Sequence, residues 1–218
     1  MLSLEFIPSL LKGLEVTVLL TAAGALASIP MALAAALAKM SGYRLLRWIA
    51  STYVEVFRGT SALVQLFWFY FVLPLMGLRL EAFTVGVIVL ALNTGAYGAE
   101  VVRGAVTAVP RSQREAALAL NFSPRQTMWR IILPQALQAI LPPAGNLMIE
   151  LLKNTALVSF ITITDLTFSA QILRAETLRT GEIFGAVLLL YFAVALAITA
   201  CVRGLERWLA RRHGSVAA

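Results

Sequence analysis

The sequence predicts an all-α protein that crosses a membrane five times and carries a short helix in one of its loops. Two features of the composition support this: 60% of the 218 residues are hydrophobic and only 13% are charged. This balance is typical of proteins with several membrane spans. The apolar residues also gather in five unbroken runs, each near the ~20 residues with which a helix crosses the hydrocarbon. Strands of a membrane barrel would alternate polar and apolar residues, so we expect helices.

We expect a single membrane domain, 1–218, in which each run forms one span. The spans cover about 16–38, 53–78, 82–104, 134–164 and 183–203. The fourth span contains Pro134, Pro142 and Pro143. Proline removes a backbone donor and kinks a helix, and the freed carbonyls need neighbours or water inside a bilayer. The sequence therefore predicts a broken fourth span that lines a cavity.

Positive charges in the loops predict the orientation of the spans. Twelve fall on one side: Lys39, Arg44, Arg47, Arg103, Arg111, Arg114, Arg125, Arg130, Arg203, Arg207, Arg211 and Arg212. Four fall on the other side: Lys12, Arg79, Arg174 and Arg179. Because cytoplasmic loops are rich in Lys and Arg, we expect the N-terminus outside and the C-terminus inside. The net charge of +7 is attributed to this topology and not to binding of nucleic acid.

The loop between the third and fourth spans carries strong helix signals. We expect a helix at about 112–121, because Ser112 and Glu115 have the spacing of a capping box. Asn121 tolerates the left-handed conformation at which helices end. Ser123 followed by Pro124 predicts a second helix start. A helix of two turns is unstable alone in water, so this one needs support from the rest of the chain or from a partner.

Acidic and basic residues three positions apart mark three of the spans. The pairs are Glu55 with Arg58, Glu100 with Arg103, and Glu150 with Lys153. Residues i and i+3 share a helix face, so each pair can neutralise itself. The first two pairs lie at the expected cytoplasmic ends, where we expect mainly a structural role. The third pair lies between apolar stretches, where an unpaired charge costs about 3 kcal/mol. A place in a substrate pathway and simple mutual pairing both fit it.

The scarcity of some residue types excludes several classes of site. A single cysteine, Cys201, cannot form an intrachain disulfide or a cysteine metal cluster. A single histidine, His213, excludes histidine clusters and histidine-based catalysis within this chain. The sequence contains no G-x-x-x-x-G-K-[ST], H-E-x-x-H or G-x-S-x-G motif. We therefore expect no catalytic residue, metal or cofactor on this chain, and any step driven by a nucleotide would use a phosphate-binding loop on another chain.

The loop at 109–134 resembles the EAA loop of binding-protein-dependent ABC transporter permeases. Glu115, Ala116 and Ala117 are followed by Ile132-Leu133-Pro134, with Asn121 where the family pattern has Gly. Further segments resemble the polar amino-acid uptake branch of that family. They are 55–60 with Gln65, 95–100 with 103–104, 133–136, 141–143 with Asn146, and 152–159. The resemblance covers roughly 13–164, and the five helices typical of that branch agree with the five spans counted here.

The resemblance implies a permease subunit of an importer in the cytoplasmic membrane. The other components would be two cytoplasmic ATPase subunits that bind ATP and Mg²⁺, an external solute-binding protein, and a second permease subunit that is either identical or a paralogue. The loop helix would dock on an ATPase as a coupling helix. The residues assigned to this contact are Ser112, Arg114, Glu115, Ala116, Ala117, Ala119 and Asn121.

The resemblance also implies transport of a polar amino acid or a similar small zwitterionic solute, including compatible solutes such as ectoine. The residues assigned to the substrate pathway are Glu150, Asn146, Lys153, Asn154, Thr155, Arg58 and Gln65. Glu150 is expected to face the cavity and contact a cationic group of the solute. A secondary transporter is the alternative, but it would need its own ion-coupling site and usually has inverted repeats, and the sequence shows no repeat.

Overall fold

The computed structural model describes residues 6–213, which form helices joined by short turns, with no strand among them. Four helices are long: α1 (Ile7–Lys39), α4 (Ala82–Ala108), α7 (Leu133–Asn154) and α9 (Thr180–His213). Five are shorter: α2 (Arg44–Gly59), α3 (Ala62–Phe67), α5 (Arg111–Ala119), α6 (Pro124–Gln126) and α8 (Leu166–Thr177). Two segments are π-helical, η2 (Trp68–Val72) and η4 (Thr127–Ile132), and two are 3₁₀-helical, η3 (Leu73–Met76) and η5 (Thr155–Ile161). The predicted all-α fold is confirmed.

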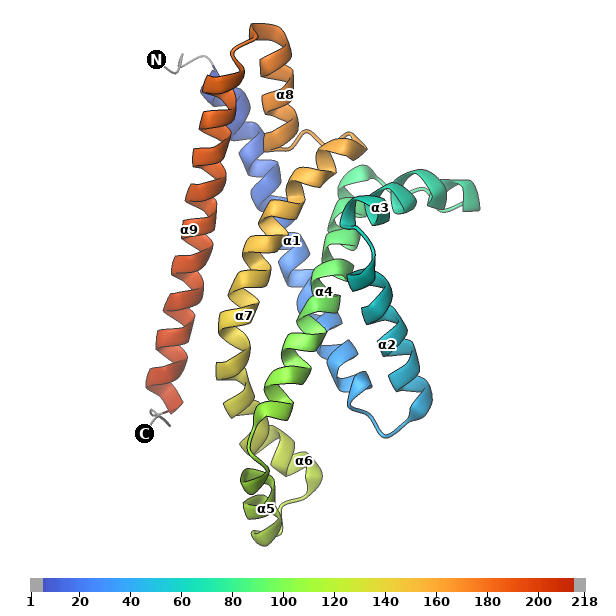
Figure 1. Cartoon of the computed structure of the whole chain (residues 1–218), viewed down its shortest axis with the longest axis vertical. Coiled ribbons are helices and arrows are strands. Elements are labelled where there is room, and N and C mark those ends of the chain that lie inside the picture. Colours follow the sequence, from blue (N-terminus) through green and yellow to red (C-terminus); the bar gives the residue numbers. More distant parts are fainter. Residues whose placement is uncertain (1–5, 214–218) are drawn as a thin grey trace.

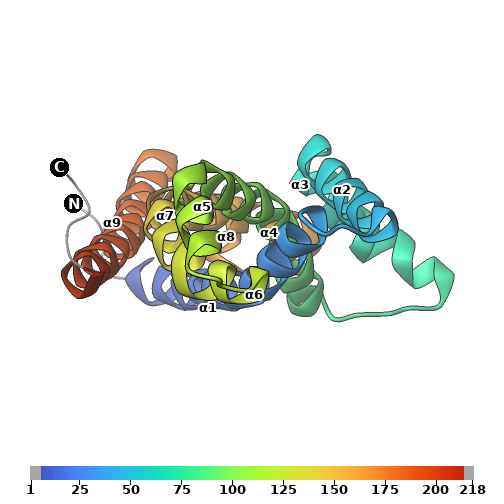
Figure 2. The same cartoon turned by 90° about the horizontal axis from the view of Figure 1, so that it is seen from below.

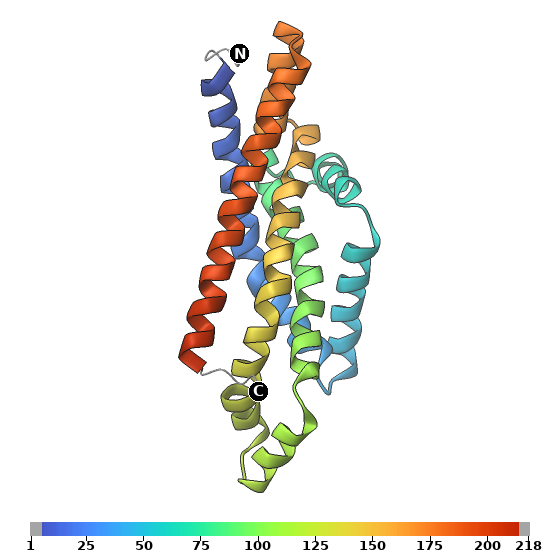
Figure 3. The same ribbon diagram turned by 60° about the vertical axis from the view of Figure 1, so that its left-hand side comes forward.

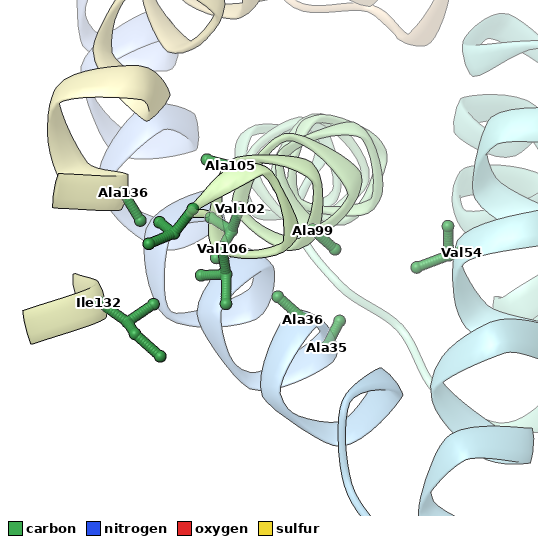
Figure 4. Packing of buried hydrophobic residues seen from close by; sticks show 10 residues of the cluster. Ala35, Ala36, Val54, Ala99, Val102, Ala105, Val106, Ile132 and Ala136 are labelled. Carbon is green, nitrogen blue, oxygen red and sulfur yellow. The ribbon is translucent and has the colours of Figure 1, made fainter. Parts of the chain in front are cut away.

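The helices α1 and α4 form the centre of the molecule and pack closely along their length (Figure 1). Small residues make this possible: a Cβ on Gly98 would lie 2.9 Å from the Cβ of Ala32, and one on Gly95 would lie 2.9 Å from the Cβ of Met31. Figure 4 shows the buried cluster at one end of this pair, where η4 and α7 also contribute side chains. The labelled members are Ala35, Ala36, Val54, Ala99, Val102, Ala105, Val106, Ile132 and Ala136.

The two ends of the molecule carry different elements. The N-terminal end of α1, α8 and α3 lie at one end, and α5, α6 and the C-terminal end of α9 lie at the other (Figures 1 and 3). Seen from the end that carries α5, α2 and α3 lie to one side of the body and α9 to the opposite side (Figure 2). The loops that the sequence places on the cytoplasmic side therefore gather at one end of the structure.

Among the described residues, three helices are long and apolar enough to cross a membrane, namely α1, α4 and α9. Two bent pairs of helices raise the number to five if each pair is counted as one span. One pair joins α2 to the segment Ala62–Met76, with a bend of 106°, and the other joins Pro124–Ile161 to α8, with a bend of 54°. The number of five expected spans therefore stays a prediction, with three candidate spans in single helices and two more if each bent pair is one span.

The second expected span, 53–78, is wrong as a single helix. The helix α2 ends at Gly59, Thr60 and Ser61 are extended, and α3 starts in a new direction at Ala62. Glycine loses more backbone freedom in a helix than any other residue, and Thr and Ser offer local hydrogen bonds that compete with the helix. These three consecutive residues explain why the helix stops here in an apolar run.

The fourth expected span, 134–164, is also corrected. The helix α7 passes through Pro142 and Pro143 without a break and ends at Asn154, after which the chain continues as the 3₁₀ segment η5. Each proline lacks the N–H that would bind a carbonyl four residues earlier, here those of Gln138 and Ala139. Both of these residues are exposed and line a pocket of about 310 Å³. The irregular backbone is found at the two ends of α7 instead of its middle.

Candidate functional site

The helix α5 projects beyond the ends of α4, α7 and α9 (Figure 1). Of its nine residues only Ala117 is buried, and the others are exposed. The predicted coupling residues Ser112, Arg114, Glu115, Ala116 and Ala119 therefore all lie on the surface. Within the chain this short helix is supported by the buried Ala117 and by two long hydrogen bonds, from Arg114 to the Val106 carbonyl at 3.5 Å and from Gln135 to Gln113 at 3.4 Å.

The predicted capping box at the start of α5 is wrong. The helix begins at Arg111 with Pro110 as its N-cap, and no side chain caps it. Proline disfavours a helical conformation in the residue before it, so Val109 is extended and α4 ends at Ala108. The Pro110 carbonyl can then accept the first hydrogen bond of α5, which Gln113 N–H donates at 3.1 Å. Ser112 consequently lies inside the first turn and not before it.

The predicted end of α5 at Asn121 is confirmed in its geometry. Asn121 has a φ of 58°, in the left-handed region. Its N–H donates to the Leu118 carbonyl at 2.9 Å, and the Phe122 N–H donates to the Ala117 carbonyl at 3.0 Å. This pair of bonds is the Schellman motif, in which Gly is the usual left-handed residue and Asn an accepted substitute.

The chain restarts at a capping box that the structure does contain. Ser123 Oγ accepts from the Gln126 N–H, and Gln126 Oε1 accepts from the Ser123 N–H, with Pro124 at the first helical position. The π-helical segment η4 follows and leads into α7 just before Pro134. Because proline cannot donate to the carbonyl four residues earlier, a local π-turn accommodates it, and such turns are frequent at functional sites.

Glutamine side chains connect α5 to the base of α7. Gln135 Nε2 donates to Gln113 Oε1 at 3.4 Å and to the Ile131 carbonyl at 2.9 Å. Next to this contact, Val109, Pro110 and Pro134 line the pocket of about 310 Å³. The loop 109–134 is thus joined to α4 next to Pro110 and to α7 next to Pro134, and both prolines line the same pocket. The hydrogen bond between Gln113 and Gln135 connects α5 to α7 beside this pocket.

The predicted pathway residues Asn146, Glu150 and Lys153 share one exposed face of α7, one turn apart. Asn146 lines a hollow of about 210 Å³ between α7 and α9. Lys153 lines a second hollow of about 340 Å³, whose other lining residues are mainly apolar side chains of α7 and α9. Among the described residues, the ion pairs are Lys39–Glu100, Arg103–Glu100 and Arg179–Glu182. Glu150 and Lys153 therefore do not form an ion pair with each other.

The other two pathway residues of this segment lie where α7 ends. Asn154 is partly buried and is the last residue of the helix. Thr155 is fully buried, and its hydroxyl donates to the Leu152 carbonyl at 2.7 Å. This bond satisfies one of the carbonyls that a helix end leaves unpaired, so Thr155 stabilises the transition into η5.

The remaining pathway residues, Arg58 and Gln65, lie at the bend between α2 and α3. Because α2 starts at Arg44 and leads away from the end that carries α5 (Figure 1), the expected position of Glu55 and Arg58 at a cytoplasmic end of a span is wrong. Gln65 is only 7% exposed, and Asn93 of α4, which the sequence did not single out, is 6% exposed. Gln65 Nε2 and Asn93 Nδ2 both donate to the Phe57 carbonyl at 3.0 Å. Gln65 Nε2 also reaches Thr60 Oγ1 at 2.8 Å, and Asn93 Nδ2 reaches Gln65 Oε1 at 3.3 Å. In the sequence, Asn93 could have been noticed because it is an amide within the apolar run of the third span.

Two further carbonyls at the end of α2 also have side-chain partners. The Thr60 hydroxyl donates to the Val56 carbonyl at 2.7 Å, and the Tyr97 hydroxyl donates to the Arg58 carbonyl at 3.4 Å. The Arg58 guanidinium carbon lies 5.2 Å from the centre of the Tyr97 ring. Three consecutive carbonyls, from Val56 to Arg58, are thus bound by side chains of the loop, α3 and α4.

The structural role expected for Glu100 and Arg103 is consistent with an ion-pair cluster at the end of the α1–α4 pair. Glu100 Oε2 lies 2.6 Å from an Arg103 nitrogen, and Glu100 Oε1 lies 2.6 Å from Lys39 Nζ. The second contact joins α4 to α1, which the sequence pattern did not indicate. This carboxylate therefore connects two helices as well as two residues of one helix.

Comparison with known proteins agrees with this architecture. Residues 28–214 match the family described as binding-protein-dependent transport system inner membrane component. The probable amino-acid ABC transporter permease protein y4tF of Sinorhizobium fredii is 43% identical over 216 residues, which cover 96% of this chain and 91% of that protein. The glutamine transport system permease protein GlnP of Escherichia coli is 37% identical over 203 residues, with coverage of 92% and 93%. The crystal structure of an amino acid ABC transporter with histidines superimposes with a TM-score of 0.87 at 38% identity, covering 93% of this chain and 95% of the other.

Proposed function

The chain belongs to the family of binding-protein-dependent transport system inner membrane components, and from this membership we propose how it acts within an ATP-binding-cassette importer. It is a multi-pass permease subunit of the cytoplasmic membrane. Its relatives are permeases of amino-acid transporters, one of them specific for glutamine by its name. This relationship favours the importer over a secondary transporter. The solute that we propose is a polar amino acid or a similar small zwitterionic molecule.

In this proposal α5 is the coupling helix that docks on a cytoplasmic ATPase subunit. The observation that carries it is a short helix, exposed on all sides but one, that lies beyond the body and has its own Schellman end. Such a helix has too few bonds to be stable in water without a partner. The docking side would face the cytoplasm, which agrees with the concentration of Lys and Arg in these loops.

The surface of the loop fits a protein partner. Leu118 is 73% exposed, Leu120 68% and Trp129 68%. Apolar side chains on a projecting loop are a common mark of an interaction site. The small Ala116 and Ala119 permit a close approach, while the arginines of the loop can meet acidic groups.

Nucleotide and Mg²⁺ would be bound by the ATPase, because this chain has no phosphate-binding motif. Closure of two ATPase subunits on ATP would move α5 and, through the base of α7, shift the permease between states open to either side. A partner shifts such an equilibrium only by its different contacts with the two states. An external binding protein would deliver the solute at the opposite end, and a second permease subunit would complete the pathway.

Replacing Glu115 by Lys tests the coupling role. The change reverses one exposed charge on α5 without touching the core. We expect Glu115→Lys to abolish uptake and transport-linked ATP hydrolysis by the assembled importer, and to leave insertion into the membrane intact. Glu176→Lys, an equally exposed reversal on α8 at the other end, is the control. Normal uptake by Glu115→Lys would refute the docking assignment.

The exposed polar face of α7 is our proposal for the solute pathway. Asn146, Glu150 and Lys153 lie along it, and a charged face at membrane depth is costly unless it faces water or other protein. Glu150 would contact a cationic group of the solute, and Asn146, Asn154 and Thr155 would contribute polar groups nearby. Arg58 would act from the bend of α2, with Gln65 beside it. The helix α4 packs against both α2 and α7, so the two groups flank one helix.

The contact of Glu150 with the solute can be tested without altering shape. Glu150→Gln keeps the volume and removes the charge, and we expect uptake per assembled importer to fall at least about tenfold, because one partner of a charge pair is lost. Glu176→Gln on α8 is the matched control. Normal affinity and rate in Glu150→Gln would leave Glu150 with a structural role only.

A further inference from the structure

The strongest unexplained feature of the molecule is the set of side chains that bind the last carbonyls of α2. A helix leaves its last four carbonyls unpaired, and within a bilayer such groups need partners from protein or from a water-filled cavity. Here the partners come from three separate elements, the loop residue Thr60, Gln65 of α3, and Asn93 of α4. Both amides are more than nine-tenths buried.

The amide of Gln65 is engaged at both of its polar atoms. Its nitrogen has acceptors at Phe57 and Thr60, and its oxygen accepts from Asn93. An amide nitrogen carries two hydrogens, and both have partners within this network. Gln65 thus has no donor left for a solute, and its effect on transport would pass through the backbone that it holds.

That backbone carries Arg58. The Phe57 carbonyl on one side of it accepts two amide bonds, and the Thr60 carbonyl on the other side accepts from Gln65 at 3.3 Å. Arg58 itself is fixed through its own carbonyl and through its guanidinium above the Tyr97 ring. A cation over an aromatic face is attracted by the ring, and a cation at a helix C-terminus is favoured by the helix dipole. Arg58 is exposed, while the backbone on both sides of it is fixed by hydrogen bonds and its guanidinium lies over the Tyr97 ring.

We propose that Asn93 and Gln65 are positioning residues, which fix the backbone on both sides of Arg58 and hold its guanidinium ready for the carboxylate of a transported solute. The planar guanidinium offers paired donors that match the two oxygens of a carboxylate. This inference rests on the proposed place of Arg58 in the solute pathway. It removes Gln65 from the solute-contacting set and adds Asn93 to the residues that determine transport.

The test is a double-mutant cycle on the complete importer in proteoliposomes. Asn93→Leu replaces the amide by an apolar group of similar size, and Arg58→Ala removes the guanidinium. The readout is the maximum uptake rate per assembled complex at saturating binding protein, with the amount of complex and its melting temperature recorded for each variant. Thr94→Val is the matched control, because Thr94 is a neighbouring buried polar residue of α4 that is 6% exposed.

We expect Asn93→Leu to lower the rate per complex about tenfold, since a displacement of about 1 Å in a binding group can cost this much or more. In the Arg58→Ala background the same change should have almost no further effect on the rate, and Thr94→Val should leave the rate near normal. If Asn93→Leu lowers the rate by the same factor in both backgrounds, the positioning role is overturned although Arg58 remains in the pathway.

Another result would show that the premise, the place of Arg58 in the solute pathway, is wrong. Full uptake by Arg58→Ala would remove Arg58 from the pathway and overturn this inference, while the importer function itself would stand on the uptake of the unaltered protein. If too little Asn93→Leu protein reaches the membrane, the cycle is run with Thr60→Val, whose side chain is exposed and whose hydroxyl bonds Val56 and Gln65. Additivity with Arg58→Ala would overturn the proposal there as well.

Discussion

The end of α2 and the middle of α7 respond in opposite ways to sequences that disfavour a helix. The helix α7 continues through two adjacent prolines, whereas α2 stops at Gly59 in a stretch that contains no proline. In α2 the last carbonyls are bound by side chains of other elements. In α7 the carbonyls that the prolines leave unpaired belong to exposed residues beside a pocket.

The difference shows that the surroundings of the freed carbonyls decide where a membrane helix ends. Proline at 142 and 143 removes two donors, yet α7 continues, and the residues that lose these donors, Gln138 and Ala139, are exposed and line a pocket. After Gly59, where three consecutive residues disfavour a helix, the chain bends by 106°, and Gln65 and Asn93 donate to the Phe57 carbonyl at this bend. Substitutions in both helices test this difference.

The largest effect is expected from removing both amides at the end of α2. The double variant Gln65→Leu/Asn93→Leu removes these donors from the carbonyls of the partly buried Phe57 and of Thr60. A buried polar group without a partner costs roughly 1–3 kcal/mol, so the melting temperature of the purified protein in detergent should fall markedly. An unchanged melting temperature would mean that the bend does not depend on these bonds.

An intermediate effect of opposite sign is expected in α7. Pro142→Ala/Pro143→Ala restores two N–H donors opposite the carbonyls of Gln138 and Ala139, and proline inside a helix costs up to about 3 kcal/mol relative to alanine. The melting temperature should therefore rise. Pro30→Ala in α1, which also contains a proline within a continuous helix, serves as the reference. A lower melting temperature of the double variant would show that the prolines themselves stabilise the packing of α7.

The smallest effect is expected from Tyr97→Phe. This change keeps the ring below the Arg58 guanidinium and removes only the hydroxyl, whose bond to the Arg58 carbonyl is long at 3.4 Å. The net loss should be about 0.5–1 kcal/mol, visible as a small decrease in melting temperature with uptake largely kept. A loss as large as that of the amide pair would show that Tyr97, and not the amides, determines the bend.

Composition and apolar runs predicted the all-α fold and the approximate positions of the long helices, because burial in a membrane imposes length and hydrophobicity directly. They did not predict the break at Thr60. Gly59, Thr60 and Ser61 disfavour a helix locally, but the amides that bind its last carbonyls lie 5 and 33 residues after Thr60, at Gln65 and Asn93, and these contacts exist only in the folded chain. The prolines were expected to break α7 because the sequence does not show their surroundings. In the folded chain the residues four positions before them line a pocket.

For the candidate site at α5, the sequence predicted one end of the helix correctly and the other end wrongly. The end of α5 at Asn121 is encoded by neighbouring residues, and its left-handed geometry was predicted correctly. The start at Ser112 was not, because a proline two residues earlier determines where the preceding helix stops. The pathway role of Glu150 and Lys153 stays a prediction, although the structure separates the two charges and leaves both exposed. Asn93 could have been noticed as an amide in an apolar run, but its partners could not.

The Schellman turn at Asn121 would let α5 keep a constant length in the proposed coupling role. Its final carbonyls are bound by the Asn121 and Phe122 N–H groups within the same turn, which would oppose unwinding of the helix by the proposed partner. A helix whose end frays would absorb part of an applied displacement as loss of its last turn. If α5 docks on an ATPase as proposed, a helix closed in this way would pass the displacement on to the π-helical segment before Pro134, where the backbone is irregular.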